Sequence, residues 1–140
     1  MKPDPRRASE RWLRQAEHDF NDAQFCASGK RYNVACFLCQ QAAGKALKAL
    51  LCGYGAREVR GHSAVELLEA SAKLAPSLAE LYRQAALVDR FYIPTRYPDG
   101  LPGGIPSEVY GEADAEQALC AAENILAAVR AALAQVFPES

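Results

Sequence analysis

The run YNVACFLCQQAAGKALKALL, residues 32–51, constrains the fold more than any other part of this chain. It is apolar on almost every side of a helical wheel, and a helix of that kind lies at the centre of a helical protein. One narrow strip departs from the pattern, because Gln41, Lys45 and Lys48 fall within about 60° of each other. A basic strip is unusual on an otherwise buried helix, so it is the first candidate site.

Helical patterns also cover most of the rest of the chain, and no strand pattern occurs. Two capping boxes, Ser63-x-x-Glu66 and Ser77-x-x-Glu80, mark helix starts. The pattern of the fourth helix turns Tyr82, Tyr92 and other apolar residues inward, with Asp89 in the middle of the same stripe. The predicted helices are residues 5–28, 32–51, 63–73, 77–93 and 112–136. We therefore expect an all-α, up-and-down bundle of four to five helices, forming a single domain over residues 1–140.

Charge and composition exclude several classes of protein. The net charge of −1 argues against general nucleic-acid binding, which usually needs a basic excess. No uninterrupted run reaches the ~18 apolar residues of a membrane span, so no membrane contact is expected. The five cysteines are odd in number and lie in helical patterns, which excludes a disulfide framework and indicates a cytoplasmic location.

The spacing Cys36-x-x-Cys39 could suggest zinc or redox chemistry. Zinc needs two further ligands at comparable spacing, and the sequence has none. A redox pair normally lies at a helix N-terminus after a strand, whereas these cysteines lie inside an apolar helical run. We expect buried, inert thiols, no metal and no required cofactor.

The segment DRFYIPTRYPDGLPGGIPSEVY, residues 89–110, is the second candidate site. Its four prolines stiffen a long connection and would hold the Arg96 guanidinium and the Tyr97 ring in fixed places. Those two groups suit a phosphate and a base. The alternative is a crossover that only packs on the helices through its apolar side chains.

Asp89 has two interpretations as well. A carboxylate on an apolar stripe needs a partner, and Lys45, Arg96 and His62 are the candidates. It could form a structural salt bridge, or it could orient Arg96 or Lys45 toward an anion. Neither glycine-rich phosphate loop motif is present, so a phosphate site would consist of side chains and helix ends.

Three stretches in the same order, CQQAAGKALKALL, GHSAVELL and TRYPD, resemble the HEPN domain family over nearly the whole chain. The stretches RWLRQAEHDF, NVACFLC and TRYPDGLPGGIPSEVY resemble most the C-terminal HEPN domain of sacsin, a chaperone-related protein. That resemblance implies a homodimer that binds a nucleotide such as GTP or ATP without catalysis, and it is compatible with a domain excised from a longer multidomain chain. Phe25, off the core stripe of the first helix, is a candidate dimer contact.

The resemblance also implies roles for individual residues. Lys45 and Lys48 would neutralise phosphate, and Arg96 would bind it with two hydrogen bonds. Tyr92 or Tyr97 would stack on the base, and Asp89 would orient the arginine. Gly44 stands where many relatives have a glutamate, which makes the basic strip more positive.

Some members of the family are ribonucleases, whose signature is an arginine followed after four to six residues by a histidine. Arg57 and His62 match the spacing, but they precede the third helix rather than lying at the later helix where the family has its pair. We therefore expect no RNA cleavage. Two alternatives remain: a pure dimerisation module without a ligand, and a HEPN partner of a minimal nucleotidyltransferase.

Overall fold

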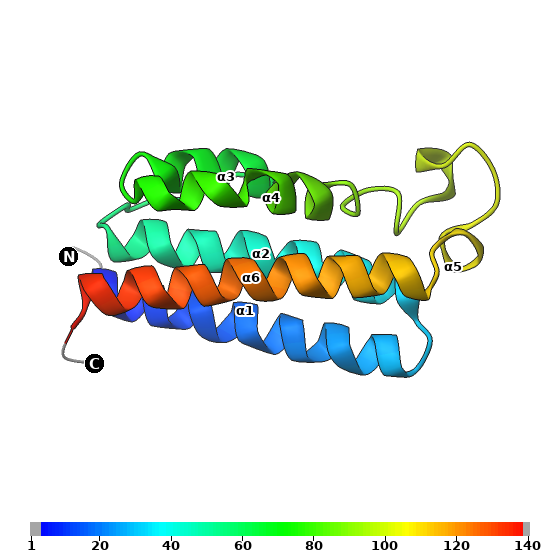
Figure 1. Ribbon diagram of the computed structural model, residues 1–140, viewed down its shortest axis with the longest axis horizontal. Helices are drawn as coiled ribbons and strands as arrows, with labels where there is room; N and C mark the ends of the chain where they lie inside the picture. Colours follow the sequence, from blue (N-terminus) through cyan, green and yellow to red (C-terminus); the bar gives the residue numbers. More distant parts are fainter. Residues whose placement is uncertain (1–3, 139–140) are drawn as a thin grey trace.

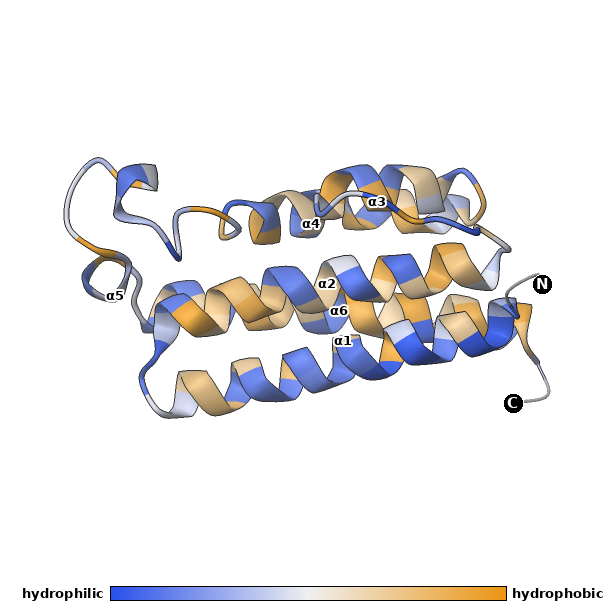
Figure 2. Cartoon of the chain, turned by 180° about the vertical axis from the view of Figure 1, so that it is seen from behind, coloured by the Kyte–Doolittle hydropathy of each residue, from blue (hydrophilic) through white to orange (hydrophobic). Residues whose placement is uncertain are grey.

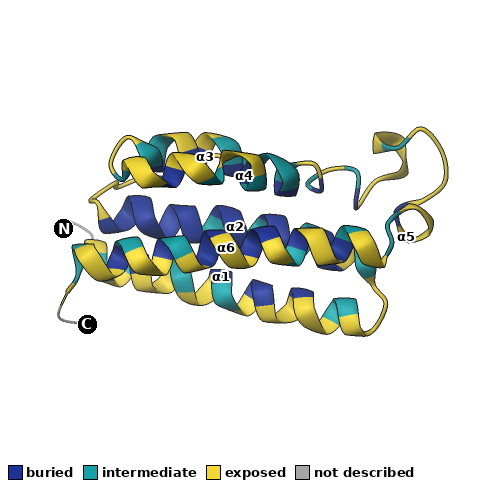
Figure 3. Ribbon diagram, in the orientation of Figure 1, coloured by how far each residue is buried: buried dark blue, intermediate teal, exposed yellow. Residues whose placement is uncertain are grey.

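Helix α2 (Tyr32–Gly53) is the central element of the bundle, as its all-round apolar pattern predicts. The computed structural model describes residues 4–138, and in that range it contains helices and turns but no strand. Figures 1 and 3 show α2 as the most deeply buried helix, covered on several sides by the others. The expected all-α bundle is confirmed.

Two long helices pack on α2. Helix α1 (Pro5–Ser28) lies antiparallel to it, and α6 (Glu112–Val136) runs in the same direction as α2 (Figure 1). The apolar stripe of α1 is buried at Ala16, Phe20 and Ala23. Phe25 lies off that stripe with 78% of its surface exposed, as the pattern predicts. The bounds of α1 and α6 agree with the sequence-based prediction.

Residues 54–63 form an extended connection that runs back along α2 before α3 (Ala64–Ala72) begins (Figure 2). The Gln40 side chain donates a hydrogen bond to the His62 carbonyl oxygen at 2.6 Å. The same carbonyl lies 3.7 Å from where a Cβ on Gly44 would be. The connection therefore places His62 beside the middle of α2, although Tyr54 follows the end of that helix.

The predicted fourth helix is wrong at both ends. The chain forms a 3₁₀ helix, η1 (Pro76–Leu81), before α4 (Tyr82–Asp89), and Ser77 makes no capping bond. Because Pro76 occupies the first position, the tight turn begins one residue before the predicted cap. Tyr82 was expected in the core but is 51% exposed.

Helix α4 also ends four residues earlier than Ile93. Proline at 94 disfavours helical geometry at the residue before it and supplies no N–H for the next helical hydrogen bond. The chain turns instead, and Phe91, not Tyr92, enters the core with 3% exposure.

The connection between α4 and α6 includes two short elements that the sequence pattern did not predict. They are η2 (Pro98–Gly100) and α5 (Pro106–Val109). Thr95 and Pro106 are buried, and the Asn33 side chain donates a hydrogen bond to the Thr95 carbonyl at 3.2 Å. The connection is thus anchored to the start of α2.

Helix α6 is long and apolar enough to cross a membrane by length and composition, with a mean hydropathy of 1.4 over 18 residues. The helix contains no uninterrupted apolar run of that length, and the expectation of no membrane contact stays a prediction. Its buried residues, including Ile125, Leu126 and Val129, face the bundle, and α6 packs mainly against α2 and α4. A core helix of a bundle has this composition as well.

The thiols of Cys36 and Cys39 are fully buried, as expected. Burial, with a smaller contribution from the Asp114 charge, raises the pKa of Cys36 to about 12. Burial also raises the pKa of Cys39 well above its usual range, with Cys36 adding to the effect. Cys120, in contrast, is exposed on α6.

We predict that a maleimide at pH 8 labels Cys120 rapidly and labels Cys36 and Cys39 only when the bundle unfolds. The thiolate is the reactive form, and both burial and the raised pKa suppress it. Peptide mapping after short exposure, with and without urea, measures this. Equal labelling of Cys36 and Cys120 in the native protein would contradict the prediction.

Candidate functional site

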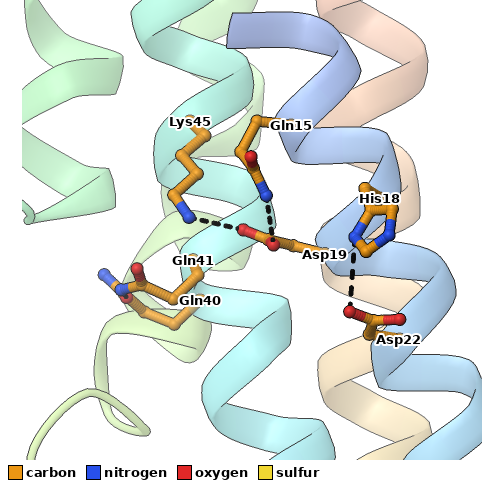
Figure 4. A network of polar contacts seen from close by, with 7 residues as sticks. All are labelled: Gln15, His18, Asp19, Asp22, Gln40, Gln41 and Lys45. Carbon is orange, nitrogen blue, oxygen red and sulfur yellow. Dashed lines mark hydrogen bonds and ion pairs between the residues drawn. The ribbon is translucent and has the colours of Figure 1, made fainter.

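Lys45 forms an ion pair with a buried aspartate that the sequence analysis did not single out. Its Nζ lies 2.7 Å from an Asp19 carboxylate oxygen, and the Gln15 side chain donates to the other oxygen at 3.0 Å (Figure 4). The Asp19 side chain is 8% exposed and that of Lys45 is 26% exposed. The pair thus joins α1 to α2, and part of the Lys45 charge is already compensated.

Lys48 lies one turn further along α2 and has a different environment. It is 9% exposed, and its Nζ lies 5.0 Å from the centroid of the Trp12 ring. Within residues 4–138, no carboxylate oxygen lies within 4.0 Å of this amine. Burial, and secondly the Lys45 charge, lower the pKa of Lys48, while Cys52 acts in the opposite direction.

The two lysines line one small cavity, which we call the lysine pocket. It has a volume of about 140 Å³, and the exposed imidazole of His62 forms part of its edge. No acidic side chain is among its lining residues. They are Trp12, Gln40, Gln41, Gly44, Lys45, Lys48 and His62.

Arg96 lies in a group of aromatic rings, which we call the arginine cluster. Its guanidinium carbon is 4.4 Å from the Phe37 ring centroid, 4.7 Å from that of Tyr92 and 5.3 Å from that of Tyr97. The Arg96 Nε donates to the Tyr92 carbonyl at 2.9 Å. No carboxylate lies within 4.0 Å of this guanidinium in the described part of the chain. Cation–π contacts therefore hold it in place.

The lysine pocket and the arginine cluster adjoin each other through His62. Its imidazole stacks on Tyr92 with 5.7 Å between ring centroids, and Tyr92 in turn stacks on Phe37 at 6.3 Å. On α2, Phe37, Gln41, Lys45 and Lys48 follow each other at spacings of three and four residues, which place side chains on one helix face. The structure thus brings together five of the six predicted site residues: Lys45, Lys48, Tyr92, Arg96 and Tyr97.

Asp89, the sixth, has a structural position beneath this surface. Its carboxylate oxygens accept hydrogen bonds from the backbone N–H groups of Ala64 at 2.7 Å and Val65 at 3.0 Å. They also accept from the Ser63 hydroxyl at 2.9 Å and the Gln40 amide at 3.1 Å. The expectation that Asp89 orients Arg96 or Lys45 is therefore wrong, because its oxygens bind the N-terminus of α3 and Gln40 instead.

Three residues of the site, Asp19, Phe37 and Trp12, were not predicted as site residues. The sequence pattern around the first two does indicate their positions. Asp19 is seven residues after Trp12 and four before Ala23, so it lies on the apolar stripe of α1. Phe37 lies four residues before Gln41, on the same strip as the lysines. The role of Trp12 as the ring beneath Lys48 depends on how α1 packs against α2, which no local pattern encodes.

Other arrangements of chemical interest are limited. Arg57 and His62 lie in the irregular connection 54–63, as predicted, rather than on a helix. Across residues 4–138, no group of three or more His, Cys, Asp or Glu side chains is arranged to hold a metal ion. The surface offers cationic and aromatic groups, which suits binding of an anion with a planar part.

Comparisons with known proteins give consistent results. The HEPN domain family matches residues 9–132. A solved structure of TT1696 from Thermus thermophilus is 39% identical, with a TM-score of 0.84, over 89% of this chain and 97% of that one. ST0689, described as an archaeal HEPN homologue, is 40% identical with a TM-score of 0.75 over the same shares. A HEPN domain protein from Thermotoga maritima is 30% identical, with a TM-score of 0.64, over 86% of this chain and 94% of that one. No curated protein matches.

We predict that Asp89→Asn lowers the free energy of unfolding by about 2 kcal/mol, because an amide nitrogen cannot accept the bonds that a carboxylate oxygen accepts at the start of α3. Urea unfolding followed by circular dichroism measures the change. Asp99→Asn, at an exposed position, is the matched control and should change stability by less than about 0.5 kcal/mol. Equal effects of the two substitutions would refute the structural role.

We predict that Lys48→Met raises stability at neutral pH and that this gain shrinks as pH rises toward 10.5. The pKa of Lys48 is lower in the folded chain than in the unfolded chain. Between the two values the unfolded chain binds more protons, so the wild-type free energy of unfolding rises with pH in that window. Methionine does not titrate, so the stability of the variant does not rise with pH in that window and its advantage over wild type shrinks.

Unfolding of wild type and Lys48→Met at a series of pH values between 6 and 10.5 tests whether the pKa of Lys48 is lowered in the folded chain. Lys73→Met, at an exposed position on the end of α3, should show no such trend. A difference between wild type and Lys48→Met that does not depend on pH would count against the prediction.

Proposed function

Because the chain belongs to the HEPN domain family, we propose that it binds a nucleotide of the GTP or ATP type without catalysing a reaction on it. The observation that carries the proposal is the continuous surface formed by the lysine pocket and the arginine cluster. A nucleotide needs positive charge for its phosphates and a flat face for its base, and this surface combines both. Its volume and composition fit one phosphate group in the pocket and the remainder outside it.

Each predicted site residue keeps a role in the proposal except Asp89. Lys48 and Lys45 supply charge to a phosphate in the pocket, although Asp19 offsets part of the Lys45 charge. Arg96 is held by its aromatic neighbours and offers its outer N–H groups to a second phosphate. Tyr97, at 50% exposure, is the accessible ring for stacking on the base, and His62 extends the platform beside Tyr92.

We also propose that the protein is a homodimer. Phe25, exposed over 78% of its surface on α1, is the candidate contact with the second copy. The absence of RNA cleavage stays part of the proposal, since Arg57 and His62 lie in the irregular connection before α3. The likeness to the C-terminal HEPN domain of sacsin, and the chaperone-related role that it implies, remain predictions.

A pure dimerisation module and a partner of a nucleotidyltransferase are the competing functions. A J-domain in the same chain would favour the sacsin-like interpretation. A nucleotidyltransferase encoded next to it would favour the partner of a nucleotidyltransferase. Either context is compatible with the surface described above.

We predict that calorimetric titration with GTP and ATP shows binding at micromolar concentration and that Lys48→Met and Arg96→Gln each weaken it at least about tenfold, or about 1.4 kcal/mol. Lys45→Ala is a poor test, because it leaves the buried Asp19 carboxylate without its cation. Light scattering on the same samples gives the mass of the binding species.

Lys73→Met and Arg83→Gln are matched controls that remove one exposed positive charge each, outside the lysine pocket and the arginine cluster. They should retain wild-type affinity. Nucleotide binding that is equal in all four variants would refute the site, and a dimer that binds neither nucleotide would favour the dimerisation module.

A further inference from the structure

A groove adjoins the arginine cluster, between the start of α2 and the connection that follows α4. We call it the α2 groove, and its volume is about 370 Å³. Arg96 and Phe37 belong both to this groove and to the arginine cluster, so the groove continues the surface proposed for the nucleotide. No acidic side chain is among its lining residues. An uncharged part of the ligand that lies beyond Arg96 would therefore meet this groove.

Asn33 gives the α2 groove a hydrogen-bond acceptor in a fixed place. Its side-chain nitrogen donates to the Thr95 carbonyl oxygen at 3.2 Å, which determines the orientation of the amide. Within residues 4–138, the Asn33 Oδ1 accepts no hydrogen bond. Thr95 also lines the groove, but it is 1% exposed and its hydroxyl donates to the Phe91 carbonyl. The Asn33 oxygen is thus held in position and is available to a donor on a ligand.

The Tyr97 ring alone does not distinguish one nucleotide from another, because every base has a flat face that stacks on an aromatic ring. Bases differ in the donors and acceptors along their edges. Adenine and guanine carry an exocyclic amine, which donates hydrogen bonds, whereas hypoxanthine carries none. A fixed acceptor pairs with such an amine and stays unpaired beside a base that lacks it, which costs binding free energy.

We propose that Asn33 selects a purine base with an exocyclic amine, which reaches the α2 groove and donates a hydrogen bond to the Asn33 Oδ1. The inference rests on the nucleotide binding proposed above and adds the class of base. The Arg96 guanidinium carbon is 5.3 Å from the Tyr97 ring centroid and Arg96 also lines the groove. Stacking on Tyr97 and recognition of the base edge by Asn33 therefore take place on either side of the same arginine.

The walls of the α2 groove suit a flat and partly apolar group. Val34 and Ile105 line it with 40% and 48% of their surfaces exposed, and Phe37 adds an aromatic ring. Covering these apolar atoms with a base is favourable. Pro106 is buried and the Asn33–Thr95 bond joins the connection to α2, so both sides of the groove are anchored. An anchored groove pays little conformational entropy when a ligand binds.

Calorimetric titration of the full chain with pairs of nucleotides that differ by one amine tests the selection. GTP and ITP differ only in the 2-amino group, and ATP and purine riboside triphosphate differ only in the 6-amino group. We expect the member with the amine to bind at least about tenfold more tightly. Inorganic tripolyphosphate, which has no base, should bind more weakly than GTP and ATP. A preference within one pair alone would also support the inference, and it would identify the base.

Asn33→Leu removes the acceptor and nearly keeps the size of the side chain. It should abolish the difference within each pair and leave the affinity for tripolyphosphate unchanged. Asn21→Leu, at an exposed position on α1, is the matched control and should keep the difference.

A second variant keeps the test decisive where Asn33→Leu fails to fold. Val34→Trp fills part of the α2 groove and leaves the Asn33–Thr95 bond in place, so it should lower the affinity for GTP and ATP but not for tripolyphosphate. Val109→Trp, at a valine that is 46% exposed outside the groove, should change none of these affinities.

The possible failures are distinguishable. Equal affinities within both pairs in the wild type, or a difference that persists in Asn33→Leu, would overturn the inference and leave nucleotide binding intact. Equal affinities for GTP, ATP and tripolyphosphate would do the same, since the base would then contribute nothing. If none of these compounds binds, the proposed function is refuted, and the inference fails with it.

Discussion

The carboxylate of Asp89 is the interaction on which the arrangement of the candidate site depends. It lies at the end of α4 and accepts hydrogen bonds from the first turn of α3 and from Gln40 on α2, so one charged group joins three helices. A helix N-terminus attracts negative charge, and the two backbone N–H groups would otherwise lie without partners. Gln40 also binds the His62 carbonyl, which keeps the connection 54–63 beside α2. The edge of the lysine pocket and the stack of His62 on Tyr92 therefore depend on Asp89, which holds both Gln40 and the start of α3.

The candidate site combines a charged pair that joins two helices with two cations that have no carboxylate partner. The Lys45–Asp19 pair joins two helices, and removing either partner would strand a buried charge. Lys48 makes no comparable ion pair, and its amine lies 5.0 Å from the centroid of the Trp12 ring. Arg96 occupies a similar position at the other end of the surface, where aromatic rings rather than carboxylates hold it. Cations without carboxylate partners at both ends of the surface are the basis of the nucleotide-binding proposal.

Part of the candidate site could be predicted from the sequence, because Lys45 and Lys48 lie on a helix whose periodicity is clear. The spacing of Gln41, Lys45 and Lys48 placed them on one strip of α2, and the proline-rich segment placed Arg96 and Tyr97 together. The role of Asp89 could not be predicted in the same way. Its position on an apolar stripe showed that it needs partners, but the partners were expected to be cations. They are N–H and O–H groups from segments far away in the sequence.

The sequence by itself determined the three long helices, the central place of α2 and the buried cysteines, because apolar periodicity and helix-end residues are local signals. It failed where local signals compete, as at Ser77, where a proline one residue earlier started a 3₁₀ turn instead of the capped helix. Only the tertiary structure decided that residues 54–63 return along α2, that Trp12 covers Lys48 and that His62 joins the two halves of the surface. These contacts depend on how whole helices pack and where a connection without periodicity runs, and neither is encoded within a single turn of helix.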